Sequence, residues 1–461
     1  MQRRAASAIG LFAVALLASL PAGSATGSRA ASGTPLPEAR PQELRGYGAL
    51  AVRQAHDLYL VDGEAPASAR FRRIERGAPV LAMAWSHDGR LLAYQTPGAL
   101  WIAARAGGAP RRIARAGALD RFAWSPRADL LLVTRYASDR MPEVARHAVV
   151  DRGTTTLIDV GGAALERLPL ATAAHDVIWS RDGRRIVAYA YHAVLPYASF
   201  ATAADALYVV RHVSRGAIAG GVRVAKTAPG GQLSAASLWP SGRGLLYWQG
   251  AERSASLAAD GLTLRSVRFG KASRKLGTMI PSTSWLSWAP DGRSVAFVDG
   301  ALRLAWYHKS LVVCEVEPVA CRTIAPPRGT VALDPAWSRR GDAIVFVRAP
   351  DLGSRTWGFR SFAAFEGAWL SKRTLWLADA HTGTTRELAS FGRGIYWPRW
   401  SRDGRRILFV REGGVWLGKL DGEAPAEVVS GMPTPREAPD QYFGSYGDVS
   451  PDDDPVAWTG S

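Results

Sequence analysis

The chain has 461 residues, of which 47% are hydrophobic, and its formal net charge at pH 7 is +17. This length suffices for one large core or for two ordinary domains. Only six of the 57 basic residues are lysines, and the arginines are spread through every segment. Nucleic-acid binding would call for basic clusters with interleaved aromatics on one element, so the composition argues against it and favours anionic envelope polymers or plain composition bias.

The N-terminus has the order of a signal peptide. Arg3 and Arg4 precede an apolar run from Ile9 to Leu20, and small residues follow. Twelve apolar residues are too few to span a membrane, and no other apolar run is long enough. We therefore predict a signal peptide at 1–25, a flexible linker at 26–46 and a periplasmic or secreted mature chain without a transmembrane segment.

One short segment recurs along the rest of the chain. "VIWSRDGRRIVAY" (Val177–Tyr189) returns almost unchanged as "PRWSRDGRRILFV" (Pro398–Val410), and successive copies are 39 to 63 residues apart. Such a period with variable insertions is typical of a modular array. Seven copies are anchored by Trp85, Trp124, Trp179, Trp239, Trp288, Trp337 and Trp400.

Each copy reads as a β-hairpin. An apolar segment ending in Trp is followed by Ser and then by Asp-Gly, as in "APDGR", where Pro290, Asp291 and Gly292 suit a type I turn and the left-handed residue after it. A third and a fourth strand follow, which predicts four-stranded antiparallel blades of a β-propeller. We interpret the tryptophans as packing residues between blades. The repeated aspartates are interpreted as turn formers and not as metal ligands; they are Asp88, Asp182, Asp291 and Asp403.

The W-S-x-D-G-x-x-I-A-F pattern resembles the WD-like repeat of TolB-type β-propellers. The resemblance covers nearly the whole mature chain and implies an all-β fold. Ala128 replaces the turn glycine in the second copy, and the fourth copy has one residue fewer after Trp239. We expect those two turns to be built differently. Nothing in the chain matches the N-terminal α/β domain expected of TolB itself, so the repeat carries the resemblance.

Four long inserts follow the second strands of their copies, and the alternation of strands places all four on one face of the propeller. Function is often carried by loops on such a rigid support. Phe362, Phe365 and Trp369 have helical spacing, so a short helix covering the propeller is one interpretation. The other is a docking surface of exposed aromatics. The candidate binding residues are Tyr191, Tyr197, Trp306, Tyr307, Trp357, Phe359 and Trp369.

The only two cysteines are Cys314 and Cys321, separated by six residues that include Pro318. A hairpin would place them opposite each other, and an oxidising compartment would let them form a disulfide across the third and fourth strands of one blade. A metal site would need two more ligands, and His308 is the only histidine close by in sequence. We predict the disulfide.

The two ends of the chain complement each other. The segment from Gly48 to Arg76 reads as three strands without a preceding W-S strand, and "VSPDDDPVAW" (Val449–Trp458) reads as a lone innermost strand. In this alignment Val449 takes the place of the tryptophan and Asp453 that of the glycine. We predict a single propeller at 47–461 with about eight blades, the last completed by both termini. A seven-bladed ring with a loose C-terminal tail is the alternative.

Catalytic signatures are not found in the sequence. There is no G-x-S-x-G elbow and no H-E-x-x-H motif, and the eight histidines are scattered. We therefore predict a monomeric, non-catalytic binding scaffold for an envelope protein, a peptide or an anionic glycan, without a cofactor or a metal. The alternative is a propeller lyase or hydrolase whose His, Asp and Arg residues converge at the mouth of the channel.

Overall fold

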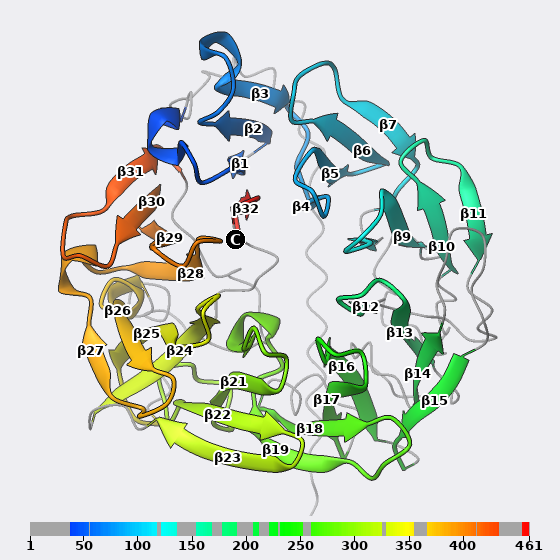
Figure 1. Cartoon of the computed structure of the whole chain (residues 1–461), viewed down its shortest axis with the longest axis vertical. Helices are drawn as coiled ribbons and strands as arrows, with labels where there is room; N and C mark the ends of the chain where they lie inside the picture. Colours follow the sequence, from blue (N-terminus) through cyan, green and yellow to red (C-terminus); the bar gives the residue numbers. More distant parts are fainter. Residues whose placement is uncertain are drawn as a thin grey trace, which may run out of the picture. The chain divides into compact units, whose positions relative to one another are not determined.

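The computed structural model describes residues 37–54, 56–117, 121–135, 154–167, 178–190, 206–211, 221–228, 231–251, 260–324, 329–354, 367–411, 413–432 and 454–460. In these ranges the strands form eight four-stranded antiparallel sheets, arranged as the blades of a β-propeller (Figure 1). The prediction of an all-β, eight-bladed propeller is confirmed. Among the same residues, no helix is long and apolar enough to cross a membrane.

We letter the strands of each blade a to d from the axis outward. The strands of blades 1 to 4, in that order, are β4 (Ala82–Trp85), β5 (Leu91–Thr96), β6 (Ala99–Ala104) and β7 (Arg111–Ala114); β8 (Arg121–Trp124), β9 (Leu130–Arg135), β10 (Thr154–Asp159) and β11 (Ala164–Arg167); β12 (Ile178–Trp179), β13 (Arg185–Ala190), β14 (Ala206–Arg211) and β15 (Gly221–Lys226); β16 (Gln232–Leu238), β17 (Gly244–Gly250), β18 (Leu262–Arg268) and β19 (Arg274–Met279).

The strands of blades 5 to 8 are β20 (Leu286–Trp288), β21 (Ser294–Asp299), β22 (Ser310–Val316) and β23 (Val319–Ile324); β24 (Thr330–Trp337), β25 (Ala343–Pro350), β26 (Thr374–Asp379) and β27 (Thr385–Glu387); β28 (Ile395–Trp400), β29 (Arg406–Arg411), β30 (Gly414–Lys419) and β31 (Ala426–Val429); β32 (Val456–Trp458), β1 (Ala49–Gln54), β2 (Asp57–Asp62) and β3 (Phe71–Glu75). The described 3-10 helices are η1 (Pro41–Leu44), η2 (Ala67–Ala69), η3 (Thr283–Trp285) and η4 (Ala389–Phe391).

The ends of the strands define two faces of the propeller. The a–b and c–d turns lie on one face, which we call the turn face. The b–c and d–a connections lie on the opposite face, which we call the insert face because it carries the long inserts. The largest cluster of buried apolar side chains runs from blade 4 through blade 8 and includes Leu50 and Trp458 from the two ends of the chain.

The a–b turns explain the recurring Ser and Asp. In blade 7 the Ser401 hydroxyl donates to the Asp403 carboxylate (2.5 Å) and accepts the backbone N–H of Arg406 (2.9 Å). The Asp403 carboxylate also accepts the N–H of Arg405 (3.0 Å). Blades 1 and 3 repeat these bonds at Ser86 and Ser180. The aspartates are therefore turn formers, as predicted. The turn at Ala128 is built differently, as expected: there the Leu130 N–H donates to the Ala128 carbonyl (2.8 Å).

The tryptophans of the repeat join neighbouring blades. In four of these contacts an indole N–H donates to the carbonyl of the residue just before the tryptophan of the preceding blade, at 2.9 to 3.3 Å. The pairs are Trp85 with Ala457, Trp124 with Ala84, Trp179 with Ala123 and Trp400 with Ala336. Trp288 instead reaches the Ser237 hydroxyl at 2.9 Å. The interpretation of these side chains as packing residues between blades is thus supported by a regular hydrogen bond.

The fourth copy is shifted by one residue relative to the sequence alignment. In blade 1 the Ser86 N–H donates to Leu91 and the Gly89 N–H donates to Ser86. In blade 4 the same two bonds involve Trp239, which therefore occupies the serine position. Leu238 takes the tryptophan position. This shift accounts for the residue that the fourth copy lacked after Trp239.

Both ends of the chain complete blade 8. β32 pairs antiparallel with β1, with Leu50 opposite Trp458 and Val52 opposite Val456. The Thr459 hydroxyl accepts the Ala49 N–H (2.8 Å), which is the bond that serine makes in the other turns. The predicted closure is confirmed, but its alignment is wrong, because Trp458 and Thr459, not Val449, take the place of Trp-Ser. Gly48, with φ +86°, lies so close that an added Cβ would be 2.3 Å from Thr459 Oγ1.

Part of the predicted linker is packed against the propeller. Ala39 forms an antiparallel bridge with Val429, and the Arg40 N–H donates to the Val428 carbonyl (2.8 Å). Leu44 in η1 is fully buried. This part of the linker predicted at 26–46 therefore lies against strand d of blade 7. The predicted signal peptide at 1–25 and residues 26–36 lie outside the described residues.

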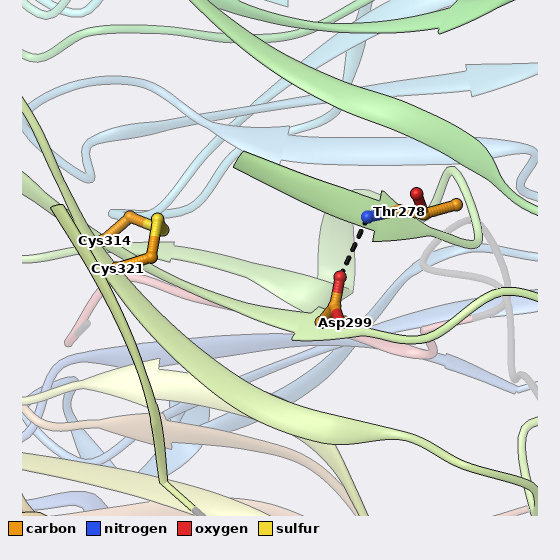
Figure 2. Close-up of a disulfide and its surroundings, with 4 residues drawn as sticks. All are labelled: Thr278, Asp299, Cys314 and Cys321. Atoms are coloured by element: carbon orange, nitrogen blue, oxygen red, sulfur yellow. Dashed lines mark hydrogen bonds between the residues drawn. A yellow bond between two sulfur atoms is a disulfide. The ribbon is translucent and has the colours of Figure 1, made fainter. Parts of the chain in front are cut away.

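The two cysteines form the predicted disulfide (Figure 2). Cys314 in β22 lies directly opposite Cys321 in β23, so the bond joins strands c and d of blade 5. On strand b of the same blade, the Asp299 carboxylate accepts the backbone N–H of Thr278 in blade 4 at 2.8 Å, also drawn in Figure 2. A covalent bond within the blade and a polar bond to its neighbour thus both hold blade 5 in place.

Candidate functional site

On the insert face, the buried side chain of Lys309 holds the b–c connection of blade 5. Its ammonium group donates to the backbone carbonyls of Ala301 (2.8 Å), Leu302 (3.1 Å) and Tyr307 (2.9 Å). Only 1% of the residue is exposed. Burial lowers the pKa of Lys309 to about 8, although Asp351 and Asp299 act in the opposite direction. The three carbonyls use all three of its protons, so Lys309 organises the loop and has none left for a ligand.

The structure brings together two of the predicted binding residues, but in the core. Trp306 and Trp369 are 0% and 1% exposed, and their rings meet edge to face with centroids 5.8 Å apart. The Trp369 indole donates to the Pro350 carbonyl at 2.8 Å. Buried rings cannot form an exposed docking surface, so these two serve as the support beneath the inserts.

The structure does not bring the other predicted binding residues together at one site among the residues that it describes. Tyr307 is half-buried and packs edge to face against His308, with centroids 4.2 Å apart. Tyr191, Tyr197, Trp357 and Phe359 lie outside the described residues. Of the expected helix, residues 367–370 form one α-helical turn. Aromatic binding on the insert face stays a prediction.

A buried ion pair, not predicted from the sequence, connects three blades. Asp334 on strand a of blade 6 binds Arg373 at 2.5 Å, and the two side chains are 7% and 2% exposed. Burial raises the pKa of Asp334, while Arg373 and hydrogen bonds from Trp285 and from the Trp397 backbone act to lower it. Asp334 is left-handed, with φ 47°, in a bulge of strand a. Because blades 5, 6 and 7 enclose its carboxylate, Asp334 has a structural role. The only sign of this role in the sequence is the Asp-Pro pair before Trp337.

On the turn face, three arginines lie on equivalent a–b turns at the mouth of the central channel. Arg181, Arg339 and Arg402 each follow the Trp-Ser pair, in blades 3, 6 and 7, and all three are exposed. Desolvation lowers the pKa of Arg339, and the positive charges of Arg181 and Arg402 lower it further. Blades 3 and 7 are on opposite sides of an eight-membered ring, and the effect of both charges on Arg339 indicates that the three side chains extend toward the channel, within electrostatic reach of one another.

A hollow of about 320 Å³ adjoins these arginines where the ring closes. Arg402, His87, Ser86 and Thr459 contribute polar groups to its wall, and Trp85 and Trp458 contribute aromatic rings. The backbone N–H of Arg402 also donates to the Gly460 carbonyl at 2.6 Å. The last residues of the chain therefore help to form both the ring and this hollow.

A larger hollow of about 540 Å³ lies between blades 2 and 3 on the same face. Asp129, Asp159 and Asp182 line it together with Arg127 and Arg184. Three carboxylates and two guanidinium groups thus line this hollow, so it lacks the positive charge that an anionic ligand would need.

Within the described part of the chain, one group has the composition of a metal site: His87, Asp88 and Asp129, with ligand atoms within 4.8 Å of one another. Burial alone would raise the pKa of Asp88, but bonds from the Arg90 backbone, the Ser86 hydroxyl and the Arg90 side chain lower it to about 2. These are the ordinary bonds of an a–b turn, so the turn itself already occupies the carboxylate.

No family model and no curated protein matches the chain. Solved structures with the same fold do. The dihydro-haem d1 dehydrogenase NirN aligns with a TM-score of 0.52 and 17% identity, over 85% of this chain and 75% of that one. A TolB of Agrobacterium tumefaciens aligns with a TM-score of 0.33 and 12% identity, over 82% of this chain and 87% of that one.

An oligogalacturonate lyase of Vibrio parahaemolyticus aligns with a TM-score of 0.42 and 11% identity, over 66% of this chain and 88% of that one. At these identities the likeness shows a β-propeller and does not distinguish TolB-type propellers from others. It also does not decide between binding and catalysis.

Proposed function

We propose that this protein is a non-catalytic scaffold that binds an anionic glycan outside the cytoplasm. The supporting observation is the charge of the turn face. Exposed arginines surround it on the a–b turns of seven blades: Arg90, Arg127, Arg181, Arg184, Arg243, Arg293, Arg339, Arg340, Arg402 and Arg405.

The aspartates of the same turns do not neutralise this charge fully. The a–b turns carry six aspartates against these ten arginines: Asp88, Asp129, Asp182, Asp291, Asp342 and Asp403. Arginines on a rigid ring can contact several anionic groups of one polymer at once, which raises the overall affinity without any single strong contact. Among an envelope protein, a peptide and an anionic glycan, a repeating polyanion fits this ring of charges best.

Two features support a location outside the cytoplasm. The sequence begins with the pattern of an export signal, and the disulfide between Cys314 and Cys321 is stable in an oxidising compartment. Insert-face binding through Tyr191, Tyr197, Tyr307, Trp357 and Phe359 is a separate proposal about the opposite face.

Retention on an immobilised polyuronate tests the proposed function. The mature chain should be retained on alginate at low salt, should pass through a neutral glucan of similar length, and should elute as salt screens the charges. Incubation should leave the length of the alginate unchanged. Passage through both columns would overturn the proposal, and progressive shortening of the alginate would favour the lyase or hydrolase alternative.

A further inference from the structure

Resting on the proposed function, we infer that the mouth of the channel on the turn face is the specific site for an acidic sugar, held by Arg181, Arg339 and Arg402. The rest of the turn face would attract an anionic glycan without fixing its position. This site would fix one acidic residue of it.

The repeat places the three arginines at one level of the ring. Each is the second residue after the repeat tryptophan, on the turn where strand a ends, and the indole of that tryptophan is packed between blades. Their backbones are therefore fixed by the most regular part of the fold. Side chains that start from rigid turns lose little freedom when a ligand binds.

The three charges repel one another. Desolvation, followed by Arg181 and then Arg402, holds the pKa of Arg339 below its usual value, so each neighbouring charge disfavours the protonated form of Arg339. No ion pair joins any of the three to a carboxylate in the parts of the chain that the structure describes. An anion at the mouth would remove this repulsion.

The neighbouring carboxylates are not available for that purpose. Asp182 and Asp403 lie one residue beyond Arg181 and Arg402, and their own turns hold them. Their pKa values are lowered, against the effect of burial, by those turn hydrogen bonds and by other arginines of the turns. Among the described residues, the three arginines outnumber these two carboxylates, which leaves a net positive charge at the mouth.

The adjoining hollow indicates what else the ligand contains. Its volume of about 320 Å³ is at the lower end for ligand pockets and suits a sugar ring rather than a long apolar molecule. Trp85 offers aromatic surface and His87 and Thr459 offer hydrogen-bonding groups, while Trp458 and Ser86 are buried in the wall. Because Arg402 belongs to both the hollow and the arginine cluster, one sugar in the hollow can present its carboxylate to the arginines.

Calorimetric titration of the mature chain with an alginate hexasaccharide tests the inference. The triple variant Arg181→Gln, Arg339→Gln, Arg402→Gln should bind at least about tenfold more weakly than the wild type, since it loses several charge-assisted contacts. The matched control Arg112→Gln, Arg274→Gln, Arg386→Gln removes the same charge from exposed positions on outermost strands. It should stay within about twofold of the wild type.

The outcomes separate the two proposals. If the wild type binds but both triple variants lose affinity equally, or neither does, the specific site is wrong and the binding scaffold stands. If the wild type binds no anionic glycan, the proposed function fails and the site fails with it. A hexaglutamate peptide that binds as tightly as the hexasaccharide would overturn the sugar assignment. Both variants should melt like the wild type, because all six side chains are exposed.

Discussion

The turn aspartates show how far a sequence pattern reaches at the scale of single residues. The spacing Ser-x-Asp-Gly predicted their role, because a short polar side chain in that place can accept backbone N–H groups two residues on. The structure confirms it at Asp88, Asp182 and Asp403. It adds the serine hydroxyl, which joins the Asp carboxylate to the start of strand b.

These turns make stability depend on acid. Burial would raise the pKa of each carboxyl, but the hydrogen bonds of the turn outweigh this effect. They lower the pKa of Asp88 to about 2 and also lower the pKa values of Asp182 and Asp403. A carboxyl with a lowered folded-state pKa stabilises the protein above its unfolded value and stops doing so as pH falls through the folded one. Urea unfolding of the wild type should therefore show a loss of free energy between about pH 4 and pH 2.

The matched variant is Asp88→Asn, Asp182→Asn, Asp403→Asn. It should be less stable than the wild type at pH 5 and should lose less of its free energy of unfolding between pH 5 and pH 2. An equal acid loss in both proteins would mean that the turn carboxylates do not contribute.

The burial of charged side chains could not be predicted from the sequence. Lys309 and Arg373 follow no repeat, and their partners are backbone carbonyls or an aspartate 39 positions away. Nothing local distinguishes them from exposed basic residues, since their environment is created only when blades pack. The same reason hid the burial of Trp306 and Trp369, which the sequence presented as insert aromatics.

Replacing Lys309 with Met should destabilise the protein by about 2–4 kcal/mol, because the carbonyls of Ala301, Leu302 and Tyr307 lose their donor inside the protein. Lys275→Met is the control, since Lys275 is exposed on β19, and it should change stability by no more than about 0.5 kcal/mol. Chemical denaturation of both variants measures the difference. Equal stability of the two would show that the ammonium group does not hold the loop.

At the scale of elements, the repeat predicted the blades and their strand order, because turn chemistry and alternation are local. It misplaced the fourth and last copies. A tryptophan one residue late looked equivalent in sequence, and only the hydrogen bonds of the turn show that Trp239 occupies a serine position. Likewise the predicted alignment of Val449 with the tryptophan is wrong, because the pairing of β32 with β1 places Trp458 there.

The indole hydrogen bond between blades can be measured by comparing two equivalent tryptophans. Trp400 donates to the Ala336 carbonyl at 2.9 Å, whereas the buried indole nitrogen of Trp337 has no hydrogen-bond partner among the described residues. Trp400→Phe should therefore cost about 1 kcal/mol more than Trp337→Phe, which removes the same atoms without breaking that bond. Equal losses in denaturant melts would show that only packing matters at these positions.

For the whole molecule, closure by the two termini follows from sequence because each end lacks what the other supplies. Its consequence is that a few C-terminal residues stabilise the whole ring. Deleting residues 454–461 removes β32 and leaves β1 as an exposed edge, so the truncated chain should melt at a lower temperature and aggregate. Scanning calorimetry with light scattering measures both effects. A truncated chain that stays monomeric and melts like the full one would contradict closure.

The binding site depends on the inferred approach of three arginines across the channel, and a cross-link tests this approach directly. Cys314 and Cys321 are bonded to each other and are the only cysteines in the sequence, so Arg181→Cys, Arg339→Cys places two free thiols at the mouth. A short bis-maleimide should join them within one chain, as read by mass spectrometry of the digested monomer. The control Arg181→Cys, Arg274→Cys, with its second thiol on the outermost strand of blade 4, should give no such link. Equal linking in both proteins, or none at the mouth, would contradict the convergence of the arginines.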